Sequence, residues 1–167
     1  MKAIPLKKLD PTLDKGNYAY SIKRIKDIYF YINESLVVPE KKEVLFETSQ
    51  TLDFNAELGL ANLTIRSYIH YSDTPKETDI LAEIKVQNIF GVPDLNDFIS
   101  EEALSFPKNL LIVMLSLSLS HTRSLFSKNI GSSVLQDQIL PVFDVLVVGK
   151  AFYPDIFNDD NEQKALE

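Results

Sequence analysis

The side chains that most often carry catalysis or metal binding are few in this sequence. It has no cysteine, which excludes disulfides, thiolate nucleophiles and cysteine-based zinc sites. Its two histidines, His70 and His121, lie in no metal-ligand spacing such as His-Glu-x-x-His. Its five glycines are too scattered to form a phosphate-binding loop. We therefore expect no catalytic residue, no metal and no cofactor, and predict that the protein is not an enzyme.

One neighbouring pair, Ser120 and His121, has the residue types of a nucleophile and its base. Adjacent side chains of a helix diverge by about 100° and do not meet, so we favour a structural role for both. His70 falls on the polar face of a predicted strand, where solvent or a cross-strand partner is the simpler expectation.

Composition and charge narrow the class further. A chain of 167 residues with 45% apolar and 25% charged residues is typical of one globular domain. Its net charge of −7 opposes binding to a phosphate backbone, so we expect no nucleic-acid partner. The first ten residues lack the apolar core of a secretory signal, and the apolar run from Leu110 to Leu119 falls short of the roughly 20 residues of a membrane span. We expect a cytoplasmic protein without membrane insertion.

Alternating apolar and polar residues predict four strands, at residues 18–32, 43–55, 63–71 and 80–90. Arg24, Ile25 and Lys26 interrupt the first alternation and predict a bulge. Short connections without a helical pattern favour an antiparallel meander or Greek key. On this alternation Tyr29, Tyr31, Tyr68 and Leu81 point outward, either as ordinary strand residues or as an exposed patch that marks an interaction site.

Residues 109–128 admit two interpretations, because Leu-Ser-Leu-Ser-Leu-Ser alternates like a strand. We favour a helix, since the run is long and free of glycine and proline, and Gly131 follows as a stop. The predicted buried side consists of Leu111, Met114, Leu115, Leu119, Thr122 and Phe126. A file of serines, Ser116, Ser120, Ser124 and Ser127, is either solvated or an oligomer interface at which helices approach closely. Residues 139–148 are interpreted as a short extended segment.

Several short motifs resemble those of the SecB-type protein-export chaperones. Residues 20–30 are similar to the family's first strand, with an arginine before Lys-Asp-Ile-x-Phe, and residues 80–90 resemble its last strand, with Leu-x-Glu-Ile and a terminal Ile-Phe. Arg123 in the long helix, Gly131 and a Leu-Pro-Val-Phe-Asp segment at 140–144 follow in the family's order. The likeness spans about residues 18–146. It departs from the family at Tyr31, where a glutamate is expected, and at the start of the family helix.

The resemblance implies a fold, a function and sites. It implies an α+β fold, a four-stranded antiparallel sheet with a long helix on one face, assembled as a dimer of dimers, so we expect a homo-oligomer, either a dimer or a tetramer. It implies ATP-independent holding of unfolded preproteins for export and docking to the translocation ATPase. Asp27, Leu81 and Glu83 match the family's ATPase-docking positions. Our candidates for part of the client groove that the resemblance implies are Ile89, Phe90 and Val92. Our candidates for the oligomer interface on the long helix are Ser116, Ser120, Arg123 and Ser124.

We expect an arm at residues 1–17, a SecB-like domain at 18–150 and an acidic tail at 151–167. The alternative function is a dedicated module for a single partner, such as an antitoxin or a phage protein. A small hydrolase built on the same sheet is the weakest alternative, because no nucleophile and base come together.

Overall fold

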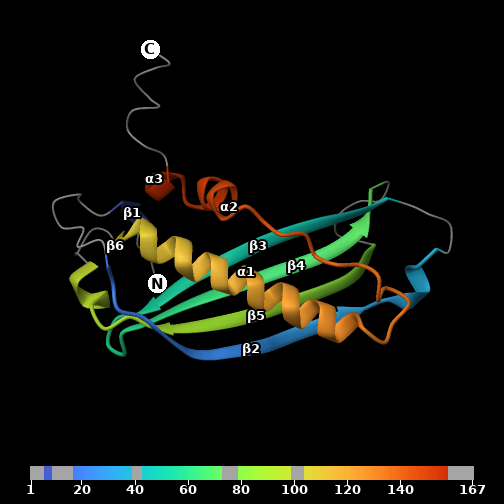
Figure 1. Ribbon diagram of the computed structural model, residues 1–167, viewed down its shortest axis with the longest axis horizontal. Coiled ribbons are helices and arrows are strands. Elements are labelled where there is room, and N and C mark those ends of the chain that lie inside the picture. Colours follow the sequence, from blue (N-terminus) through green and yellow to red (C-terminus); the bar gives the residue numbers. More distant parts are fainter. Residues whose placement is uncertain (1–5, 9–16, 39–42, 73–78, 99–103, 158–167) are drawn as a thin grey trace, which may run out of the picture.

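The chain forms a four-stranded antiparallel sheet crossed on one face by a long helix (Figure 1). This arrangement is seen in a computed structural model that describes residues 6–8, 17–38, 43–72, 79–98 and 104–157. The sheet has the order β2-β5-β4-β3, and its strands are β2 Ser21–Ile32, β3 Val44–Asn55, β4 Leu60–Tyr71 and β5 Ile80–Gly91. The predicted fold class is confirmed.

The two faces of the sheet differ in what covers them. On β5, Ile84, Val86 and Phe90 are buried in core clusters that include side chains of the long helix. The alternate positions, such as Lys85 and Gln87, face the other way, because successive side chains of a strand point to opposite sides. We call that second side the open face. Residues paired across strands share a face, so the register places each paired strand residue on one side or the other.

The strand β2 is bent where the sequence suggested irregularity. Its pairing with β5 shifts register between Ile22 and Arg24, and again between Asp27 and Tyr29. The predicted bulge is therefore present, but as two shifts that flank residues 24–27. The consequence is that the side chains of β2 change faces twice along the strand.

The long helix α1, Lys108–Ile130, has the buried side that the sequence predicted. All six predicted residues are buried, and Met114, Leu115 and Phe126 are fully so. By length and composition α1 would also suit a membrane span, a property shared by core helices of soluble proteins, and here it packs on β4 and β5. Gly131 follows the last turn as predicted.

Buried polar residues divide the interior under α1 into two apolar clusters. Leu111, Met114 and Phe90 belong to one cluster, whereas Phe126 and Ile84 belong to the other. Between them lie buried polar side chains, which we call the polar belt: Ser67 of β4, Asn88 of β5, and Ser118 and Thr122 of α1. His121 joins this belt through its Nδ1, which lies 2.7 Å from Oδ1 of Asn88.

The prediction of an extended segment at residues 139–148 was wrong in its second half. Residues 139–144 are irregular, but α2 spans Val145–Phe152. The carboxylate of Asp144 accepts hydrogen bonds from the backbone N–H groups of Leu146 and Val147, which caps the helix and overrides the β-branched composition. The short helix α3, Pro154–Phe157, follows, and a Cβ at Gly149 would lie 2.3 Å from the ring of Phe157. Only glycine allows so close an approach.

Four minor elements complete the described chain: β1 Leu6–Lys8 pairs in parallel with β6 Leu104–Phe106, and η1 Glu34–Leu36 and η2 Leu95–Phe98 are short 3-10 helices. Most of the predicted arm and the tail from residue 158 lie outside the described residues.

Candidate polypeptide-binding surfaces

An ion pair organises the open face near one end of the sheet. Arg66 of β4 donates two hydrogen bonds to Glu83 of β5, from Nε at 2.7 Å and from an Nη at 2.8 Å. The side chain of Glu83 is 7% exposed and that of Arg66 is 38% exposed. Hydrogen bonding to Arg66 holds the pKa of Glu83 below its usual value, and the same bond raises the pKa of Arg66. Glu83 is thus a fixed, neutralised carboxylate rather than a free surface charge.

Tyrosine rings line the same face, and positively charged side chains lie over two of them. The ammonium of Lys85 lies 5.2 Å from the ring centre of Tyr29, and the guanidinium of Arg66 lies 4.8 Å from that of Tyr68. Tyr29 and Tyr31 are exposed, which confirms part of the predicted outward aromatic patch, whereas Leu81 is fully buried. The tyrosines of β2 are therefore available to a partner.

His70 lies near a residue of the neighbouring strand, which was one of the two predicted environments, and it is not exposed to solvent. It is 1% exposed, its Nδ1 lies 2.8 Å from the carbonyl oxygen of Tyr71, and its Nε2 lies 3.4 Å from a carboxylate oxygen of Glu47. Among the described residues no group of three or more His, Asp or Glu side chains could hold a metal ion.

The three residues assigned to ATPase docking are not displayed together. Asp27 pairs with Val86, on the α1 side of the sheet, where it accepts a hydrogen bond of 2.6 Å from Asn129 of α1. Leu81 lies at a register shift and is buried in the second core cluster, and Glu83 is paired with Arg66. The expectation that Leu81 points outward was wrong, and Glu83 lies on the open face but is almost fully buried in its pair with Arg66. The bulges and the ion pair, neither visible in simple alternation, are the physical reason.

The residues assigned to client binding are mostly in the core. Phe90 and Val92 are buried with Leu111 and Met114, so they are not a binding surface in this conformation. Ile89 is half-buried on the open face. By contrast, Ser116, Ser120, Arg123 and Ser124 are exposed on α1, with Arg123 Nε donating to the carbonyl oxygen of Leu140 at 2.8 Å. Their interface role stays a prediction.

The edge strand β2 carries a row of exposed apolar side chains. Tyr20 and five residues of β2 are each between 39% and 43% exposed: Ile22, Ile25, Ile28, Tyr29 and Tyr31. The register places Ile22 and Ile25 on the α1 side and the two tyrosines on the open face. A twelve-residue edge strand with unpaired backbone groups and apolar side chains is a template for another strand.

A second apolar surface lies on the α1 side, in and before α2. We call it the C-terminal margin, and it consists of Ile139, Val142, Leu146, Val147 and Phe152. Val142 is 79% and Val147 64% exposed. Sequence reasoning missed this surface because the apolar run at residues 139–148 was interpreted as a short extended segment. The signal that would have found it is Asp144, a helix N-cap that splits the run and turns one side of α2 to solvent.

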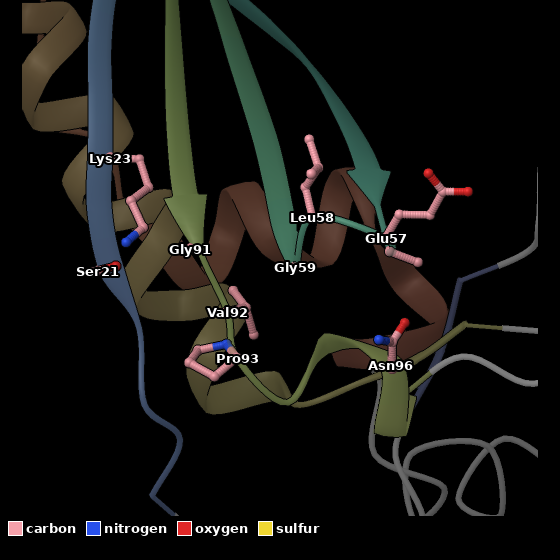
Figure 2. Close-up of a pocket in the computed structure, with 10 residues that line it drawn as sticks. Ser21, Lys23, Glu57, Leu58, Gly59, Gly91, Val92, Pro93 and Asn96 are labelled. Atoms are coloured by element: carbon pink, nitrogen blue, oxygen red, sulfur yellow. The ribbon is translucent and has the colours of Figure 1, made fainter.

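A hollow of about 330 Å³ lies where three segments meet at the end of the sheet (Figure 2). It is formed by the start of β2, the β3–β4 turn and the end of β5. The stem of Lys23 crosses Gly91, where a Cβ would lie 2.4 Å from the lysine Cε. Gly91 occupies an open-face position of β5, so Lys23 extends over the open face. The carboxylate of Glu57 lies on the opposite side of the hollow from Lys23 (Figure 2).

The comparisons with known proteins concern the fold. No protein-family model and no curated protein matches the sequence. Among solved structures, a SecB-like chaperone of Mycobacterium tuberculosis, in complex with a peptide from an antitoxin, superposes with a TM-score of 0.55. The alignment covers 75% of this chain and 90% of that one at 11% identity. A Streptococcus agalactiae protein of unknown function aligns at a TM-score of 0.33 and 8% identity, over 77% of this chain and 98% of that one. The fold is therefore SecB-like.

Proposed function

We propose that the protein is an ATP-independent chaperone that holds non-native polypeptides through the C-terminal margin. The observation that carries the proposal is the exposure of five large apolar side chains within the fourteen residues 139–152. Apolar patches on a folded protein commonly mark surfaces that another molecule covers. The SecB-like chaperone that shares this fold binds a peptide, which supports the same class of ligand here.

The chemistry of the margin suits varied clients. Its side chains are aliphatic or aromatic, so contact depends on removing apolar surface from water and not on fixed hydrogen-bond geometry. The preceding backbone, residues 139–144, has no regular structure, which leaves room for adjustment to different chains. Work in the cytoplasm without any catalytic step is part of this proposal.

Suppression of aggregation tests it. The protein should keep two or more unrelated unfolded proteins in solution without ATP, as followed by light scattering. The double variant Val142→Asp/Val147→Asp should lose this activity while keeping its fold, because both side chains are exposed. Leu58→Asp is the matched control, since Leu58 is 67% exposed in the β3–β4 turn, away from the margin. Equal loss in the control, or none in the double variant, would contradict the proposal.

The second candidate is a module dedicated to one polypeptide partner. One observation favours it over a general export role: the three residues assigned to ATPase docking are not free on the surface. Asp27 is hydrogen-bonded to Asn129, Leu81 is buried, and Glu83 is paired with Arg66. Delivery to a translocation ATPase rests only on the resemblance. Protection of one client and not of others would favour the dedicated module.

Self-association is part of the same proposal. The edge strand β2 offers unpaired backbone groups between apolar side chains on both faces, and a second copy related by a two-fold axis would continue the sheet antiparallel and cover both edges. We therefore place the first oligomer contact at β2, with the serine file of α1 as a further contact.

A further inference from the structure

We infer that the open face over β2 and β5 binds an acidic, extended segment of a partner polypeptide. This inference goes beyond the chaperone proposal, because the C-terminal margin lies on the α1 side of the sheet, opposite the open face (Figure 1). It rests on three observations: the sign of the charges, their spacing, and the hollow at Lys23.

The open face of β2, β5 and β4 is positively charged, although the whole chain carries −7. The register brings four basic side chains to this face and one carboxylate. The basic side chains are Arg24, Lys26, Lys85 and Arg66, and the carboxylate is that of Glu83. Arg66 already pairs with Glu83. Within the described residues neither Arg24 nor Lys26 forms an ion pair, and both are exposed. Their charges are therefore available to a ligand.

The spacing of these charges matches an extended peptide. Arg24 and Lys26 face the same way two residues apart, which separates them by about 7 Å along the strand. Alternate side chains of an extended peptide have the same separation, so carboxylates at every second position meet both cations. Lys85 reaches the same line from β5, where its partner across the strands is Tyr29.

The hollow extends this surface at the end of β2. Lys23 lies across Gly91 with Ser21 beside it, and the volume of about 330 Å³ is sufficient for one side chain or a chain terminus. The line of basic residues therefore runs from Lys23 through Arg24 and Lys26 to Lys85.

A peptide fits this surface better than a nucleic acid does. The next strand outward, β3, presents Glu47 and Asp53 on the same open face, so the positive strip is narrow and bordered by carboxylates. A continuous phosphate backbone would meet that border and the overall negative charge. A short acidic segment lying along β2 avoids both.

Fluorescence anisotropy tests the inference with a labelled peptide of about a dozen residues in which glutamate alternates with threonine. The acidic peptide should bind, and added salt should weaken binding because exposed charges are screened. The variant Arg24→Glu/Lys26→Glu should weaken it by about tenfold or more. Lys128→Glu, which reverses an exposed charge on α1, is the matched control and should leave binding unchanged.

Three results would overturn the inference: equal binding of the peptide with glutamine in place of glutamate, no effect of Arg24→Glu/Lys26→Glu, or tighter binding of a single-stranded oligonucleotide. The chaperone proposal is tested independently of this inference, because the two use different surfaces and different variants. Val142→Asp/Val147→Asp should keep full affinity for the acidic peptide, and Arg24→Glu/Lys26→Glu should keep aggregation suppression.

Discussion

Removing Arg66 should destabilise the fold much more than neutralising its partner Glu83. The pair is asymmetric, because the side chain of Glu83 is 7% exposed and that of Arg66 is 38% exposed. In Arg66→Met the carboxylate stays in place with only Lys85 nearby, at 3.6 Å. A buried charge that loses its partner costs about 3 kcal/mol. In Glu83→Gln the partly exposed guanidinium can turn to water and the amide still accepts one hydrogen bond, so the cost is about 1 kcal/mol.

Urea unfolding at neutral pH measures both costs. The expected difference of about 2 kcal/mol corresponds to roughly 30-fold in the folding equilibrium constant. Arg24→Met, an exposed arginine on the same face, is the matched control and should change stability by no more than about 0.5 kcal/mol. Each variant should keep the slope of the wild-type transition, which shows that only stability has changed.

The pH dependence gives a second check. Arg66 holds the folded-state pKa of Glu83 below the ordinary 4.5, so the pair contributes stability above that pH, and this contribution is lost as pH falls through the folded pKa. The penalty of Arg66→Met should therefore shrink as the pH is lowered, because without Arg66 burial raises the pKa of Glu83 and the carboxyl takes up a proton. Equal costs for the two substitutions, or a penalty that does not change with pH, would refute the reasoning.

Two further predictions follow from other parts of the fold. Burial lowers the pKa of His121 below 6.5 in the folded protein, so as pH falls below 6.5 the unfolded chain binds a proton before the folded chain does. The urea midpoint should therefore drop between neutral pH and pH 5.5. The drop should be less steep in His121→Gln, in which the glutamine amide can still donate a hydrogen bond to Asn88. A slope equal to that of the wild type would exclude His121 as the cause. Ile25→Lys should lower the mass measured by light scattering, because a charge on the edge strand β2 opposes pairing with a second copy, whereas Leu58→Lys should leave the mass unchanged. An unchanged mass for Ile25→Lys would show that β2 does not form the oligomer contact.

The sequence predicted the four strands, their antiparallel pairing and the buried side of α1, because these follow from side-chain periodicity. Leu111, Met114 and Phe126 fall on one helical face whatever surrounds them. The placement of Asp27 could not be predicted in the same way. It depends on register shifts in β2, and a shift of one residue moves a side chain to the other face.

The candidate sites were harder to predict because they depend on partners far apart in the chain. Glu83 has the alternation of an exposed residue, yet Arg66, 17 positions away, removes its charge from the surface. Phe90 is the second-to-last residue of β5 but packs under α1. The exposed run at 139–152 depends on a cap at Asp144 that local hydropathy does not reveal.

The helix α1 packs on the sheet through two apolar clusters, one on each side of the polar belt. Phe126 and Ile130 anchor one end in the second cluster, and Leu111 and Met114 anchor the other end in the first. The hydrogen bond between His121 and Asn88 adds a directional contact between the helix and the sheet, because its geometry depends on the relative position of one residue from each. Sliding the helix along the sheet would break this hydrogen bond and leave the oxygen of a buried amide without its partner, so the belt opposes such a movement.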